Sequence, residues 1–154
     1  MVEKTTDGNL TVRGDSVRVD GQANGQSSKI VLGNKLSATG TASADLTAPV
    51  NGNLLVEGTK ADGATANGTA VAVGNGGQII GNLAGGGSLT VQAAATDAAT
   101  PANNGTVKVT GGGLVSKVAQ AGASGGLTIQ GGNILATPCR RLRGGFHPDQ
   151  TSLL

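Results

Sequence analysis

Short alternations of apolar and polar residues recur along the chain, separated by Gly-rich segments such as "DGQANGQSS", "VGNGGQ" and "TGGG". Alternation over a few residues between turn-forming segments is typical of half-buried β-strands. The pattern therefore predicts an all-β chain. The alternating segments lie at 9–12, 17–19, 29–32, 53–56, 70–73, 88–91, 106–109 and 127–129.

Two segments predict β-hairpins. In "LTVRGDSVRV" (10–19), a two-residue loop at Gly14-Asp15 would place Val12 opposite Val17 and leave polar residues on the other face. Glycine as the first loop residue suits a type II′ turn, which needs a positive φ there. The segment "LTIQGGNILA" (127–136) repeats the same arrangement around a Gly-Gly pair.

The first of these loops also spells a known adhesion tetrapeptide. Arg13, Gly14, Asp15 and Ser16 form the motif that animal integrins bind in extracellular matrix. The turn accounts for every residue of the ten-residue stretch, whereas adhesion accounts for four of them. We therefore expect a turn, with an adhesive role as the alternative.

The strand signals recur loosely, about every 17 to 24 residues, and are compatible with two architectures. One is a small antiparallel β-barrel or sandwich with long Gly-rich loops, and the other is a parallel β-solenoid. Two-residue hairpins favour the antiparallel form, because parallel strands need a longer crossover. One segment, 114–123, has apolar residues at helical spacing and predicts at most two helical turns.

Composition indicates a thin core. The 154 residues correspond to a single domain by length, but they include no Trp, no Tyr and one Phe against 28 Gly. Only 13% of residues are charged and the net charge is +2, so the chain is not of the charge-expanded disordered class. We expect the isolated chain to be marginally stable and to assemble with copies of itself.

The sequence contains no recognisable catalytic constellation. The single histidine, His147, has no motif around it, and Cys139 is alone, which excludes an intrachain disulfide. Glu3 and Glu57 are the only glutamates, and no stretch approaches a membrane span. With aromatic residues nearly absent, there is no stacking platform for nucleic acid. We expect no enzyme activity, cofactor, metal or small-molecule substrate, and no nucleic-acid or membrane partner.

The C-terminal segment differs in character from the predicted β domain at 1–138. Residues 139–154 follow Pro138 and hold three arginines within four positions. We predict an extended basic arm that contacts a neighbouring subunit, with a solvated tail as the alternative. The residues predicted to make these contacts are Arg140, Arg141, Leu142, Arg143 and Phe146.

Two long segments resemble a known family. "LLVEGTKADGATANGTAVAVGNGGQIIGNLAGGG" (54–87) and "GGGLVSKVAQAGASGGLTIQGG" (111–132) are similar in composition and rhythm to the head decoration, or cement, proteins of tailed phages. The resemblance covers about half of the chain. It implies a non-enzymatic, all-β virion protein that stabilises the head, often as a trimer, with a major capsid protein as its partner.

A second functional class remains open. Secreted β-solenoid adhesins or filament subunits on bacterial surfaces, such as haemagglutinins and autotransporter passengers, share strands rich in Gly, Thr and Asn. They normally require an export signal, and "MVEKTTDGN" at the start of this sequence has no apolar segment. We therefore expect synthesis in a host cytoplasm and a virion location, with an extracellular or cell-surface location as the alternative.

Overall fold

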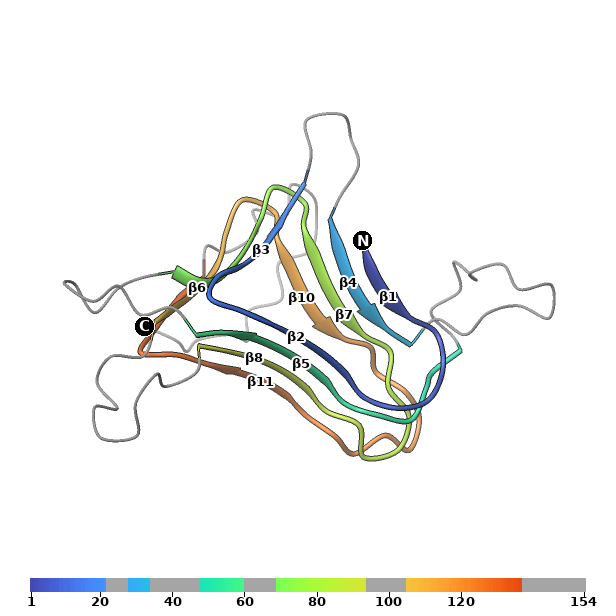
Figure 1. Cartoon of the computed structure of the whole chain (residues 1–154). Coiled ribbons are helices and arrows are strands. Elements are labelled where there is room, and N and C mark those ends of the chain that lie inside the picture. The colour runs from blue at the N-terminus through green and yellow to red at the C-terminus, as the bar shows by residue number, and fades with distance from the viewer. Residues whose placement is uncertain (22–27, 34–47, 60–68, 94–104, 137–154) are drawn as a thin grey trace, which may run out of the picture.

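The chain winds into a stack of strands with three sides. The computed structural model describes residues 1–21, 28–33, 48–59, 69–93 and 105–136, and these residues form strands and no helix. Figure 1 shows the sheets as three sides of a triangular stack. Sheet A has the strand order β1-β4-β7-β10, sheet B β2-β5-β8-β11, and sheet C β3-β6-β9-β12.

Each circuit of the chain contributes one strand to each sheet, and we call such a circuit a rung. Rung 1 is β1 to β3, rung 2 is β4 to β6, rung 3 is β7 to β9, and rung 4 is β10 to β12. The strands are β1 (Val2–Lys4), β2 (Leu10–Gly14), β3 (Val17–Asp20), β4 (Lys29–Leu32), β5 (Leu54–Gly58), β6 (Thr69–Gly74), β7 (Gln78–Gly81), β8 (Leu89–Ala93), β9 (Thr106–Val109), β10 (Leu114–Lys117), β11 (Leu127–Gln130) and β12 (Asn133–Ala136).

The prediction of an antiparallel barrel or sandwich is wrong. Every strand pair in the three sheets is parallel. The all-β prediction is confirmed, and the strand order is that of a β-solenoid, the alternative architecture. The long crossover that parallel strands require is supplied by the rest of each rung, which passes through the other two sheets before returning.

Both predicted hairpins are also wrong, for one physical reason. β2 and β3 belong to different sheets, so Gly14-Asp15 lies at a corner where the chain bends from sheet B into sheet C. Val12 and Val17 both pack against the core, as predicted, but each pairs with a neighbouring rung, at Val56 and Val71. The corresponding corner between β11 and β12 replaces the second hairpin.

The short helix predicted within 114–123 is absent. Residues Leu114–Lys117 form β10 and pair with β7. The chain then makes a turn in which the N–H of Ala123 donates to the carbonyl of Gln120 at 3.1 Å. Ladder hydrogen bonds to a neighbouring strand outweigh a weak helical preference in so short a segment.

The core is built of columns of similar residues that run along the stack. A column is the set of residues at one register position in the four strands of a sheet. The first inward column of sheet B consists of four leucines, and one column of sheet C consists of three valines and an isoleucine. Full burial of one such side chain, as in rungs 2 and 3, contributes roughly 1.5–3 kcal/mol. The leucine column is Leu10, Leu54, Leu89 and Leu127, and the sheet C column is Val17, Val71, Val107 and Ile134.

Rungs 2 and 3 differ from rungs 1 and 4 in burial. Leu89 in rung 3 is 0% exposed, whereas its rung 4 partner Leu127 is 43% exposed. Val107 is 0% exposed, and its partner Ile134 is 50% exposed. An inner rung is covered from both sides, and an end rung from one side only. Rung 4 therefore presents partly exposed apolar residues at its end of the stack. At the other end Val2 of rung 1 is 43% exposed, whereas Val17 and Val19 are buried.

Candidate functional site

The tetrapeptide at the first corner is bonded to rung 2. The Nε of Arg13 donates to the Oε1 of Glu57 in an ion pair. The hydroxyl of Thr59 donates to Oδ1 of Asp15 at 3.5 Å, and the hydroxyl of Ser16 donates to the carbonyl of Thr69 at 3.1 Å. These contacts give the corner a structural role that is independent of any adhesive one.

Glu57 is the centre of this corner. Its side chain is 6% exposed, against 61% for Arg13, and its second oxygen accepts from Nε2 of Gln92 in rung 3. Arg13, Glu57 and Gln92 occupy one register position in three successive strands. A nearly buried carboxylate with both oxygens bonded is a polar link between rungs rather than a free acid or base.

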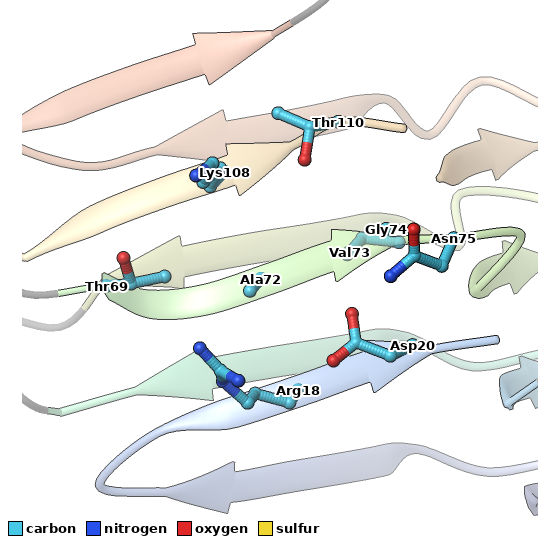
Figure 2. A pocket seen from close by; sticks show the side chains of 9 residues that line it. All are labelled: Arg18, Asp20, Thr69, Ala72, Val73, Gly74, Asn75, Lys108 and Thr110. Carbon is cyan, nitrogen blue, oxygen red and sulfur yellow. The ribbon is translucent and has the colours of Figure 1, made fainter. Parts of the chain in front are cut away.

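A groove on the outer face of sheet C is the candidate binding site. It encloses about 230 Å³ and is open to solvent. Figure 2 shows side chains from β3, β6 and β9 around it. The lining residues are Arg18, Asp20, Thr69, Ala72, Val73, Gly74, Asn75, Lys108 and Thr110.

Two cations flank the groove at one register position. Arg18 in β3 pairs with Ala72 in β6, and Ala72 pairs with Lys108 in β9. Because adjacent strands lie about 4.8 Å apart, the two cationic residues are separated by about 9.6 Å along the stack. Alanine between them leaves space that a longer side chain would fill.

The next outward position forms the second half of the groove. Asp20 pairs with Gly74 at the ends of β3 and β6, and Thr110 follows the end of β9. A Cβ on Gly74 would lie 3.2 Å from the carbonyl oxygen of Thr110, 3.5 Å from Oδ1 of Asp20 and 3.7 Å from Oγ1 of Thr110. Figure 2 shows the Asp20 carboxylate and the Thr110 hydroxyl both directed toward β6. The absent side chain of Gly74 therefore opens the space between them.

The groove residues carry charges that are not neutralised by close partners. Within the described ranges, the one ion pair is that of Arg13 with Glu57, so Arg18, Asp20 and Lys108 have none. The groove thus combines two cations, one carboxylate, two threonine hydroxyls and the amide of Asn75. Such a set can bind an anionic group and can also donate to and accept from hydroxyls.

The residues that the structure describes contain neither a cluster of potential metal ligands nor a helix that could span a membrane. Among the residues it describes, no three His, Cys, Asp or Glu side chains gather as a metal site would require. In the same part of the chain, no helix is long and apolar enough to cross a membrane.

The predicted site residues divide into two groups. The tetrapeptide residues Arg13 to Ser16 lie together at the first corner. The five predicted contact residues of the arm, between Arg140 and Phe146, lie outside the described residues, as do His147 and Cys139, so the arm and the boundary at 138 stay predictions.

The groove was not predicted, although the sequence carries a signal for it. "VRVD" (17–20), "VAVG" (71–74) and "VKVT" (107–110) align position by position. Once parallel pairing is assumed, the second position of each segment gives Arg18, Ala72 and Lys108. Comparison with known proteins adds nothing to this picture, since no protein-family model, curated protein or solved structure matches the chain.

Proposed function

We propose that this chain is a non-enzymatic structural protein that forms the shaft of a surface adhesin or filament by stacking end to end with copies of itself. The observation that supports this proposal is the in-register repetition of core columns through four rungs, with partly exposed apolar residues at both ends. A stack built in this way can continue by adding rungs of the same kind.

The two ends are complementary in strand direction and in residue type. All strands are parallel, so rung 1 of one copy can pair with rung 4 of the next by the same ladder hydrogen bonds that join rungs within the chain. In-register continuation would place Leu10 on Leu127 and Val17 on Ile134, apolar on apolar. Such head-to-tail contacts do not close on themselves and therefore produce filaments.

One position opposes this stacking. Lys4 and Lys117 occupy the same column as Leu32 and Gly81, so stacking would bring Lys4 of one copy beside Lys117 of the next. Inward-pointing charges at sheet edges weaken edge-to-edge association. The proposal therefore predicts an association that is weak at low salt and stronger when salt screens the lysine pair.

The surface location rests on the solenoid architecture and on strands rich in Gly, Thr and Asn, which secreted solenoid adhesins share. The capsid-decoration function stays a prediction from the resemblance at 54–87 and 111–132. The all-β fold is compatible with both functions, and the parallel stack of rungs is the feature that favours the surface shaft.

Sedimentation velocity of the full chain over a range of concentrations and salt tests the proposal. We expect oligomers that grow with concentration and salt, and Lys117→Glu should lower the concentration at which they form, because it replaces a like-charged pair by an opposite one. Lys29→Glu is the matched control, since it makes the same charge change in rung 2, away from both ends. A monomer under all conditions, or equal behaviour of the two variants, would contradict end-to-end stacking.

A further inference from the structure

The outer face of sheet C carries charge in a pattern that a structural shaft does not require. Arg18 and Lys108 are exposed, lie at one register position and form no ion pair, although Asp20 lies on the same strand as Arg18. A solvated face usually mixes single charges at unrelated positions. Here two cations are separated by one small residue along the axis of the stack.

We propose that this groove binds an acidic polysaccharide through its carboxylates, with the sugar chain lying along the stack across β3, β6 and β9. The guanidinium of Arg18 and the ammonium of Lys108 would each bind a carboxylate, and the guanidinium can do so through two parallel hydrogen bonds. A linear chain suits the groove because the cations are about 9.6 Å apart along the stacking axis.

The floor of the groove favours a ligand that approaches the backbone of β6. Ala72 and Gly74 face the groove from the second half of that strand, and neither side chain extends beyond a methyl group. Asp20 and Thr110 stand on either side of the position that a side chain on Gly74 would occupy. A bulky polymer backbone can therefore lie on β6 with cations on one side and hydrogen-bonding groups on the other.

The remaining groups favour an acidic sugar over a nucleic acid. Asp20 repels phosphates and carboxylates alike, but it accepts hydrogen bonds from the several hydroxyls that each acidic sugar carries, as the side-chain oxygens of Thr69, Thr110 and Asn75 also can. Aromatic residues make up 1% of the chain, which leaves nothing for bases to stack on. Two cations also give a weaker phosphate contact than most nucleic-acid sites have.

Calorimetric titration of the full chain tests this proposal with three probes: polygalacturonate, its fully methyl-esterified form and single-stranded oligo-thymidine. The methyl ester keeps the sugar backbone and removes the charge. We expect salt-sensitive binding of polygalacturonate, and no binding of the ester. Ester binding equal to that of the acid, or oligo-thymidine binding tighter than polygalacturonate, would overturn the proposal.

Variants locate the binding on sheet C. Arg18→Ala and Lys108→Ala should each weaken polygalacturonate binding about threefold, and together about tenfold, since exposed charge pairs contribute modestly and distant sites add. Ala72→Glu should abolish it by placing a carboxylate between the cations. Lys29→Ala, which removes one charge from sheet A, is the matched control.

Each variant is first checked for an unchanged melting temperature, so that lost binding is not lost folding. A loss with Lys29→Ala equal to that with Arg18→Ala would show general charge attraction and refute the groove. This test does not depend on stacking, because a single copy contains all three strands of the groove.

Discussion

A column of glycines at the corner between sheets A and B gives the sharpest test of the rung stacking. Gly8, Gly52, Gly87 and Gly125 occupy this corner in successive rungs, and a Cβ on any of the last three would meet the carbonyl oxygen of the glycine before it. For Gly87 the distance to the Gly52 oxygen would be 2.4 Å, and that to Cβ of Leu83 would be 2.9 Å. Gly87→Ala should therefore force two rungs apart.

The expected magnitude follows from two opposing effects. Overpacking of a tight site costs about 2 kcal/mol, because backbone atoms rather than a flexible side chain must move. Replacing glycine by alanine restricts the unfolded chain and returns about 0.7 kcal/mol. The net destabilisation of about 1.3 kcal/mol corresponds to a decrease in melting temperature of about 3 to 5 °C for a chain of this size.

The neighbouring residue provides a control with the same chemical change. Gly86 is exposed, and the nearest atom to a Cβ built there is Oγ of Ser124, at 3.9 Å. Neither Gly86 nor Gly87 has a positive φ, so backbone strain does not distinguish them. Thermal unfolding followed by circular dichroism should show Gly87→Ala melting lower and Gly86→Ala unchanged or slightly higher. Equal melting temperatures for the two variants would refute the close approach of the rungs.

Three further predictions concern the polar groups and the tail. Asn82→Ala should destabilise the chain by about 1–3 kcal/mol in urea unfolding, because the buried amide donates to the Gly33 carbonyl at 3.0 Å and accepts from Gln120 at 2.8 Å. Glu57→Ala should lower the free energy of unfolding more than Asp15→Ala does, because Glu57 is nearly buried and Asp15 makes one exposed contact. If integrin-bearing cells still attach to the Asp15→Ala variant, the adhesive role is excluded. Removal of residues 139–154 should leave the melting temperature intact and weaken self-association in sedimentation, whereas unchanged association would indicate a solvated tail.

The sequence predicted most strands but not how they pair. The eight alternating segments lie on or overlap strands of the structure, because alternation reports which side chains face inward. A bend at Gly14-Asp15 with apolar residues on both sides satisfies a hairpin and a solenoid corner equally well. Local pattern therefore determined the inward face of Val12 and Val17 but not whether their strands share a sheet.

The pairing of strands between rungs was not predicted, although the sequence contains a repeat that indicates it. "GNLTV" (8–12), "GNLLV" (52–56), "GSLTV" (87–91) and "GGLTI" (125–129) share glycine, leucine and a β-branched residue at fixed positions. Loops of different length separate the copies, and this variation conceals the period. Aligning them identifies the glycine column and predicts parallel stacking. β10 could not be found in this way, since its outward positions include Leu114 and Ser116 and its period resembles a helix.

The site was less predictable than the fold. Arg18 and Lys108 are separated by ninety positions in the sequence, and only the pairing of β3, β6 and β9 brings them to one row. The basic tail, in contrast, is conspicuous in sequence because its arginines are adjacent. The residues of 139–154 are close together in the sequence and were therefore predicted as a site. The groove residues are close together only because their strands pair across rungs.

Disulfide trapping tests the end-to-end stacking most directly. Thr11 and Thr128 occupy one register position in rungs 1 and 4, about 14 Å apart within a chain, but about 4.8 Å apart between stacked copies. That shorter separation suits a disulfide. In a Cys139→Ser background, Thr11→Cys with Thr128→Cys should give a ladder of covalent oligomers on oxidation, whereas Thr11→Cys with Thr90→Cys should not. Monomers from the first pair, or equal ladders from both, would contradict stacking of rung 1 on rung 4.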